Sequence, residues 1–193
     1  MDAPVVVADI FILFAFIFRI PLARLFFDTR KTQNYDRFLK TLNDVKFKLG
    51  DWKKTILSPI LIISILYFIW FVYYRVILKY TLVSGMNDSI QNIIAFNLIL
   101  APFTEEIIQG FVLSFAYCLS RFANFNEFKT VSVALLLISI ILAFGHQPWN
   151  FTSIIMLSIL FIVYGVIYYL NDRNLLPAIV AHIMWNLLSA FVL

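Results

Sequence analysis

Residues Phe151–Leu170 read FTSIIMLSILFIVYGVIYYL, a run of apolar and small polar residues without a single charge. The hydrocarbon core of a bilayer is about 30 Å thick, and an α-helix needs about 20 apolar residues to cross it. A helix also satisfies its backbone hydrogen bonds internally, as a segment in lipid must. The stretch therefore predicts a transmembrane helix.

Other apolar stretches extend this prediction to most of the chain. They are residues 3–18, 55–74, 90–119, 130–145 and 175–193. The first is apolar except for Asp9, and the third is longer than one crossing and contains Pro102, which is expected to break or kink it. We therefore predict an all-α, polytopic membrane bundle of about six transmembrane helices.

The composition supports a membrane protein. Of the 193 residues, 62% are hydrophobic, 13% are charged and 21 are phenylalanine. Soluble domains are typically about half apolar and about one quarter charged. The length favours one integral membrane domain, residues 1–193, and the single cysteine, Cys118, excludes an intrachain disulfide.

The positive charges are distributed unevenly. Ten of the 15 Lys and Arg residues lie between Arg19 and Lys54. If six helices alternate, three more lie on the same side, namely Arg121, Lys129 and Arg173, and only Arg75 and Lys79 lie opposite. Positively charged loops stay in the cytoplasm, so we predict a multi-pass cell-membrane protein with residues 28–54 cytoplasmic. The net charge of +4 then points to lipid head groups as partners, not to nucleic acid.

Residues 28–54 carry apolar side chains at near-helical spacing between basic ones. Such a segment is predicted to lie amphipathically on the inner leaflet. A solvated loop is the alternative.

Two acidic residues, Glu105 and Glu106, stand side by side in the apolar sequence LILAPFTEEIIQGFVL of residues 98–113. A charge at membrane depth costs about 3 kcal/mol or more, so it is a functional-site hypothesis by default. Neighbouring residues of a helix differ by about 100° in direction. We therefore expect one carboxylate to face a cavity and the other to face a supporting partner.

The chain has two histidines, and both lie in predicted membrane helices. His146 occurs in LAFGHQP, and His182 in PAIVAHIMWN, which ends at Asn186. A spacing of four puts His182 and Asn186 on one helix face. Pro177 fits the first turn of that helix, so His182 lies towards the positive helix end, where negative charge is stabilised.

These residue types suggest peptide hydrolysis. A carboxylate can act as general base on water, a histidine can orient the water or shuttle the proton, and His and Asn can hold an oxyanion. No cofactor is required for this chemistry. Two histidines and a glutamate are also a zinc-ligand set, so Glu105, His146 and His182 are the candidate ligands if a divalent metal takes part. The simpler alternatives are interhelical hydrogen bonds for the histidines and a structural pair or proton path for the glutamates.

In this order and spacing, the residues resemble the CPBP family, the CAAX-protease and bacteriocin-processing intramembrane proteins. That family shows Glu-Glu-x-x-x-Arg, then Phe-x-x-x-His, then His-x-x-x-Asn. The closest stretch is FIVYGVIYYLNDRNLLPAIVAHIMWN, residues 161–186, and the protease-like core covers residues 90–193.

The resemblance implies an intramembrane endopeptidase that hydrolyses a membrane-proximal bond of a peptide or membrane-protein substrate. It implies Glu105 as the base that activates water and Glu106 as its supporting neighbour. It further implies His146 as the second catalytic group, and His182 with Asn186 as the oxyanion or water-positioning pair. Bacterial members are linked to peptide maturation and bacteriocin immunity.

Two positions depart from the family pattern. Gly110 stands where the motif has arginine, and Leu142 where it has phenylalanine. The arginine would pair with Glu106 one turn earlier. Without it, Glu106 is protonated, or bonded by Gln109, or paired with an arginine of another helix, or the site has decayed. A decayed site would favour the alternative that the chain is a non-catalytic scaffold or immunity subunit that binds another membrane protein. A proton-coupled transporter would use the same acids, but the sequence shows no internal repeat.

The predicted helix lengths pose a geometric problem. At about 1.5 Å per residue, His146 and Glu105 lie roughly 22–24 Å from the inner ends of their helices, whereas His182 lies about 10 Å from Leu175. Straight, upright helices would keep His182 apart from the other two. A site therefore requires a tilted last helix or a turn at residues 171–176 that dips into the bundle.

Overall fold

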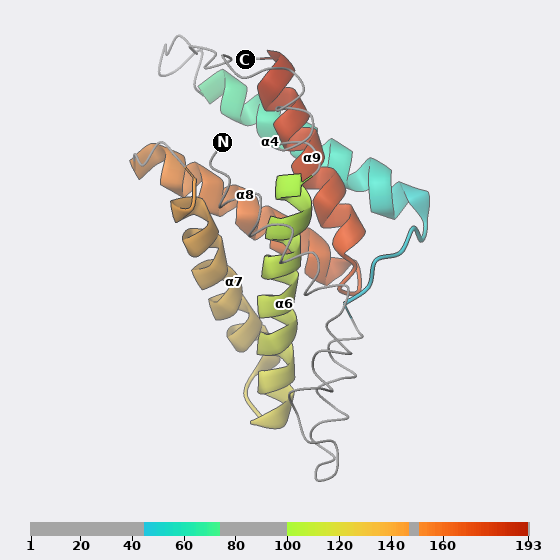
Figure 1. The fold of residues 1–193 in the computed structure, drawn as a ribbon, viewed down its shortest axis with the longest axis vertical. Coiled ribbons are helices and arrows are strands. Elements are labelled where there is room, and N and C mark those ends of the chain that lie inside the picture. The colour runs from blue at the N-terminus through green and yellow to red at the C-terminus, as the bar shows by residue number, and fades with distance from the viewer. Residues whose placement is uncertain (1–44, 74–99, 147–150, 193) are drawn as a thin grey trace.

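A computed structural model describes residues 45–73, 100–146 and 151–192, and helices make up most of this part of the chain. The helices are the π-helical turn η1 (Lys53–Leu57), which continues into α4 (Ser58–Val72), then α6 (Ala101–Phe122), α7 (Glu127–Phe144), α8 (Phe151–Leu170) and α9 (Leu175–Val192) (Figure 1). The predicted all-α fold is confirmed. The span predicted at 3–18 and the first ten residues of the one at 90–119 lie outside the described residues, so the number six stays a prediction.

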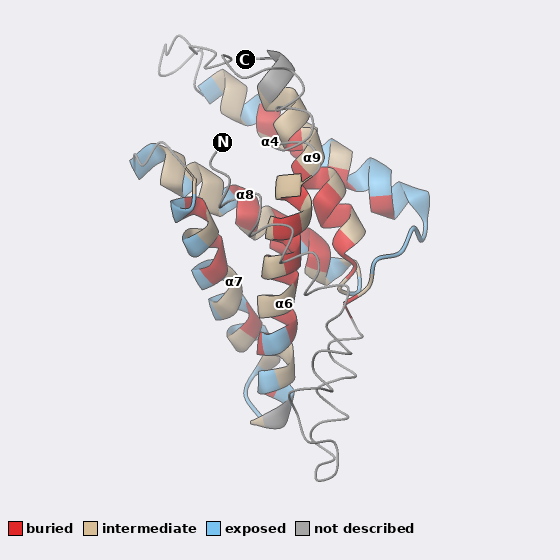
Figure 2. Ribbon diagram, viewed as in Figure 1, coloured by how far each residue is buried: buried red, intermediate tan, exposed pale blue. Residues whose placement is uncertain are grey.

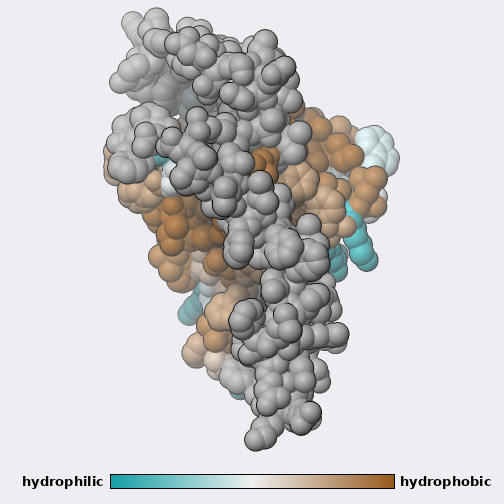
Figure 3. Space-filling view, in the orientation of Figure 1, coloured by the Kyte–Doolittle hydropathy of each residue, from teal (hydrophilic) through white to brown (hydrophobic). Residues whose placement is uncertain are grey.

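In the described part of the chain, three helical stretches are long and apolar enough to cross a membrane, namely Lys53–Val72, Glu127–Phe144 and Phe151–Leu170. Buried residues face the inside of the bundle (Figure 2), and hydrophobic side chains cover its described flanks (Figure 3). Among the large apolar side chains that are more than half exposed are Leu61, Ile65, Phe68, Leu137 and Ile141. An apolar surface of this extent suits lipid and not water, so the described part is a membrane helix bundle.

The helix ends agree with the sequence prediction at α8 and differ at α7. The prediction started α7 at residue 130, but the helix begins at Glu127. The reason is a cap, because the side-chain oxygen of Asn126 accepts a hydrogen bond of 3.0 Å from the backbone N–H of Lys129. α6 begins with Pro102 in its first turn, where a proline costs no helical hydrogen bond.

The core lies where α6 meets α7, α8 and α9, while α4 packs against α9. Its most deeply buried apolar side chains include Ile63, Leu113, Phe161, Tyr164 and Ile179. Gly165 lets α8 approach its neighbours closely, because a Cβ there would collide with Cδ1 of Leu135 and lie 3.1 Å from Nε2 of Gln109. Small residues at helix contacts are typical of membrane bundles, in which close packing replaces the hydrophobic effect.

The turn between α8 and α9 lies part-way along α6, well above the α6–α7 turn in the view of Figure 1. Leu175 begins α9 beside Gly110, since a Cβ on that glycine would lie 2.7 Å from Cδ2 of Leu175. α9 then runs back along α6, so its second turn reaches the level of Glu105 and Glu106. A raised turn is one of the two arrangements that the sequence required for a site.

The described end of the basic segment, residues 45–50, is extended. Lys46 forms two backbone hydrogen bonds of 2.9 Å with the α8–α9 turn. The side chain of Asn174 continues this pairing, because its amide donates to the carbonyl of Lys48 at 2.8 Å and its Oδ1 accepts from the N–H of Lys48 at 3.0 Å. The amphipathic helix that the spacing predicted is therefore wrong for residues 45–50, because their backbone groups form hydrogen bonds with the α8–α9 turn. Residues 28–44 lie outside the described part.

Candidate active site

α6 carries both glutamates close to its start. The hydroxyl of Thr104 bonds back to the carbonyls of Leu100 and Ala101, at 3.1 Å each, so it is satisfied within the helix. The side chain of Glu105 is 18% exposed, whereas that of Glu106 is 1% exposed. One carboxylate is therefore partly accessible, and its neighbour is enclosed.

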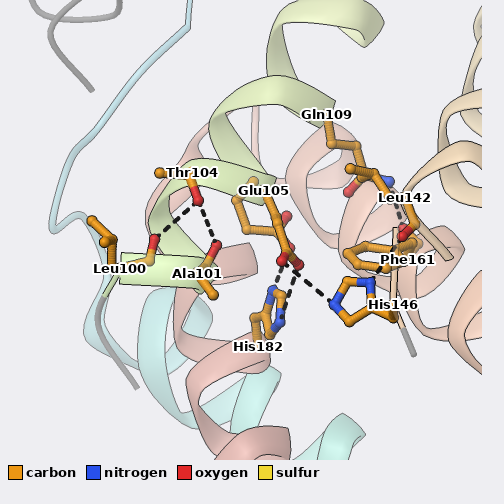
Figure 4. A network of polar contacts seen from close by, with 10 residues as sticks. Leu100, Ala101, Thr104, Glu105, Gln109, Leu142, His146, Phe161 and His182 are labelled. Carbon is orange, nitrogen blue, oxygen red and sulfur yellow. Dashed lines mark hydrogen bonds and ion pairs between the residues drawn. The ribbon is translucent and has the colours of Figure 1, made fainter. Parts of the chain in front are cut away.

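Two histidines approach Glu105 from different helices (Figure 4). His146 follows the end of α7, and its Nε2 lies 3.5 Å from Oε1 of Glu105. His182 belongs to α9, and its Nε2 lies 3.7 Å from Oε2 of the same carboxylate. Each oxygen of Glu105 thus faces a different imidazole.

His182 also holds the second glutamate. Its Nδ1 lies 3.0 Å from Oε1 of Glu106, which is within hydrogen-bonding distance, unlike the two contacts to Glu105. Both side chains of this pair are buried. A buried carboxylate without a partner is strongly destabilising, so this hydrogen bond explains how the fold accommodates Glu106.

The Nδ1 atoms of both imidazoles are engaged. Nδ1 of His146 lies 2.8 Å from the carbonyl oxygen of Leu142, and because a carbonyl only accepts, this nitrogen carries a hydrogen. The same holds for Nδ1 of His182 when Glu106 is ionised. In its neutral form, each histidine then presents the lone pair of Nε2 to Glu105. The carboxylate of Glu105 also only accepts, so two acceptors would face each other without a hydrogen between them. These contacts, at 3.5 and 3.7 Å, therefore need a shared proton or a water that bonds to both atoms from beside the pair.

The structure brings together four of the five predicted site residues, because His146 approaches Glu105, and His182 approaches both Glu105 and Glu106. The fifth, Asn186, is partly buried one helical turn after His182. Its spacing places it on the same face of α9.

α8 adds an aromatic wall, formed by Phe161 and Tyr164, that the sequence prediction missed. The ring of Tyr164 stacks on His182 with the centroids 4.7 Å apart and an interplanar angle of 17°. Phe161 contacts His182 at 5.9 Å and His146 at 5.5 Å between centroids. A spacing of three puts both aromatic residues on one helix face. That spacing is a usable signal, but it is equally typical of ordinary core positions.

Neighbouring side chains fill the space around Gly110, the position at which the family motif has arginine. A Cβ on Gly110 would lie 2.7 Å from Cδ2 of Leu175 and 3.5 Å from ring atoms of Tyr168. An arginine there would therefore require the buried side chain of Leu175 to shift. The glycine instead lets α9 approach α6, and that approach brings His182 to Glu106.

Gln109 does not bond Glu106 as the sequence suggested. Its Nε2 donates to the carbonyl of Phe161 at 2.7 Å and to Oγ of Ser139 at 3.3 Å. Gln109 therefore ties α6 to α7 and α8. Of the alternatives for Glu106, this one does not hold, because the amide of Gln109 is bonded to α7 and α8, whereas the partner of Glu106 lies on α9.

Within residues 45–73, 100–146 and 151–192, no group of three or more His, Cys, Asp or Glu side chains is arranged to hold a metal ion. The residues predicted as zinc ligands, Glu105, His146 and His182, are not placed as such a group.

The described helices thus bring two glutamates and two histidines together inside an apolar bundle. Comparison with known proteins gives the family: the one described as Type II CAAX prenyl endopeptidase Rce1-like matches residues 88–188. This range is more than half of the chain and includes all five predicted site residues. The chain belongs to this family of proteases, and the resemblance to CAAX proteases is confirmed. No curated protein and no solved structure matches the chain.

Proposed function

We propose that this chain is an intramembrane endopeptidase in which Glu105 activates a water molecule for attack on a membrane-proximal peptide bond. One observation carries the proposal: the two oxygens of Glu105 face the Nε2 atoms of His146 and His182, at 3.5 and 3.7 Å. A carboxylate in this position is a general base with a neighbouring group that can orient its water.

The nucleophilic water is proposed to lie within hydrogen-bonding reach of both Glu105 and His146, beside their 3.5 Å contact. The side chain of His146 is 34% exposed, so this side of the site is the more accessible to water and substrate. Its Nδ1–H is directed to Leu142, which leaves Nε2 to accept one hydrogen of the water while Glu105 removes the other. The hydroxide oxygen then bonds to the scissile carbonyl carbon. Glu105 passes its proton to the amide nitrogen as the carbon–nitrogen bond breaks.

His182 and Asn186 are proposed to stabilise the oxyanion of the tetrahedral intermediate. When His182 carries a hydrogen on both ring nitrogens, Glu106 holds Nδ1–H, and Nε2–H is directed towards the site. Asn186 supplies a second donor type on the same face of α9. Glu106 acts in this scheme as a positioning residue, as carboxylates that orient a histidine do in other sites.

The setting proposed for the reaction is a cell membrane crossed several times by this chain, with residues 28–54 on the cytoplasmic side. Membrane lipids and a peptide or membrane-protein substrate are the proposed partners. The family suggests a prenylated CAAX peptide as the first substrate to examine.

The test uses the full chain in lipid nanodiscs with a farnesylated CAAX peptide and its unprenylated counterpart. Wild-type protein should release the C-terminal tripeptide, and Glu105→Gln should abolish cleavage without unfolding the protein. Glu127→Gln is the matched control, because Glu127 is an acidic residue at the start of α7 that contacts Arg121 and Tyr169 and not the site. Equal rates for wild type and Glu105→Gln would reject the assignment.

A non-catalytic scaffold or immunity subunit is the second candidate function, and Gly110 in place of the motif arginine favours it. It predicts copurification with a membrane protein and a binding function that Glu105→Gln leaves unchanged. We place the protease first because His182 supplies Glu106 with a partner although the arginine is missing.

A further inference from the structure

We propose that Tyr164 of α8 is a positioning residue of this site and acts on the reaction through the imidazole of His182. The proposal rests on the proposed function above. It assigns a role to a residue outside the five that the sequence motifs indicate.

Two aromatic rings restrict the imidazole of His182. Tyr164 covers one face of it in a nearly parallel stack, with centroids 4.7 Å apart and planes at 17°. Phe161 approaches the same imidazole at 81° and 5.9 Å, and it packs against Tyr164 at 89° and 5.9 Å. All three side chains are buried. Rotation of the imidazole about its Cβ–Cγ bond would drive it into one of these rings.

The plane of this imidazole decides both of its polar contacts. Nδ1 is directed to Glu106 at 3.0 Å and Nε2 to Glu105 at 3.7 Å, and both nitrogens act within the plane of the ring. A rotated ring would lose the hydrogen bond to Glu106 and turn Nε2 away from the proposed site of reaction. A misplacement of about 1 Å can lower a rate by roughly 100-fold, so a group that holds this plane affects catalysis without touching the substrate.

The ring of Tyr164, and not its hydroxyl, carries this role. The hydroxyl oxygen is buried and has no hydrogen-bond partner in the described part of the chain. Tyr164→Phe therefore keeps the stack and removes an unpaired polar group, whereas Tyr164→Leu removes the stack.

Tyr67 provides a matched control within the same molecule. Its hydroxyl is likewise buried without a hydrogen-bond partner in the described part. Its ring also packs against α9, but on Trp185 at 5.3 Å between centroids rather than on a histidine. Tyr67→Leu should therefore cost stability in a similar way without affecting the orientation of His182.

The experiment measures kcat and KM in nanodiscs, together with the side-chain NMR signals of protein labelled with ¹⁵N-histidine. The chain has only two histidines, so His146→Gln assigns the signals. Tyr164→Leu should lower kcat by about 10- to 100-fold, the range seen when a group that orients a functional histidine is removed, with KM unchanged. It should also shift or broaden the Nδ1–H signal of His182. Tyr164→Phe and Tyr67→Leu should retain both kcat and the signal. If Tyr164→Leu does not fold, Tyr164→Met, with its adaptable side chain, takes its place.

Three results would overturn the proposal: an unchanged kcat and His182 signal in Tyr164→Leu, an equal loss in Tyr164→Phe, or an equal loss in Tyr67→Leu. The NMR signal needs no turnover, so it tests the orientation of His182 even if the wild-type chain cleaves no peptide. Inactive wild-type protein would reject the proposed function, whereas active wild type with unaffected Tyr164→Leu would reject only this inference.

Discussion

Nδ1 of His182 lies 3.0 Å from Oε1 of Glu106, and this hydrogen bond joins α9 to α6 between residues 76 positions apart in the chain. It occupies the place of the in-helix ion pair that the family motif would form between Glu106 and an arginine at position 110. The partner of Glu106 thus lies on a neighbouring helix instead of on the same one. In this chain, the charge of Glu106 and the orientation of the His182 imidazole are therefore coupled.

The first prediction concerns this coupling. Glu106→Gln should fold but lower kcat by about 10- to 100-fold, because an amide orients the imidazole less strongly than a carboxylate does. Since both residues act as one unit, the double variant Glu106→Gln/His182→Gln should cost little more than His182→Gln alone. Steady-state kinetics in nanodiscs measure the cycle, with Glu127→Gln as control. Fully additive losses would show that the two side chains act independently.

The second prediction concerns Gly110. Gly110→Ala should lower the free energy of unfolding by about 1–3 kcal/mol, the usual cost of overpacking, because its Cβ would lie 2.7 Å from Leu175. Gly110→Arg should destabilise the protein further and should not raise activity, although it restores the motif. Gly50→Ala is the control, since its Cβ would meet only Oγ1 of Thr55, at 3.9 Å. Thermal unfolding in detergent measures the effect, and a stable, more active Gly110→Arg would contradict this packing argument.

The third prediction concerns Asn174. Its side chain makes hydrogen bonds of 2.8 and 3.0 Å with Lys48, so Asn174→Ala should cost about 1–3 kcal/mol. Release of the extended segment should also speed tryptic cleavage after Lys46 and Lys48. Asn171→Ala is the comparison, because that amide bonds only locally to the carbonyl of Ile167 among the contacts described. Unchanged cleavage at the two lysines would show that Asn174 does not hold the segment.

The fourth prediction concerns metal ions. The proposed mechanism uses only protein groups and water, so wild-type activity should persist after incubation with 1,10-phenanthroline and removal of the chelator by gel filtration. Peptide cleavage before and after treatment is the measurement. A loss of activity that Zn²⁺ restores would instead support Glu105, His146 and His182 as ligands.

Hydropathy was sufficient to predict helices and insufficient to predict their ends. α8 has the predicted bounds, since twenty uncharged residues leave a lipid-facing segment no other stable backbone. α7 starts three residues earlier than predicted, because its end depends on the capping hydrogen bond of Asn126. Residues 45–50 are extended despite an apolar pattern compatible with a helix, because their partners in the α8–α9 turn come from more than 120 positions away.

The sequence by itself determined a helical membrane protein and the residue types of its candidate site: two glutamates, two histidines and an asparagine at family spacing. These features follow from local rules, namely apolar length, helical periodicity and motif order. Tertiary structure alone decided that His182 and not Gln109 partners Glu106, that Tyr164 stacks on that histidine, and that a raised α8–α9 turn brings α9 to the level of Glu105. Such contacts depend on how closely and at what level helices pack, and here they depend on Gly110 leaving room for Leu175. That fit is a property of two surfaces meeting, and neither helix sequence specifies it separately.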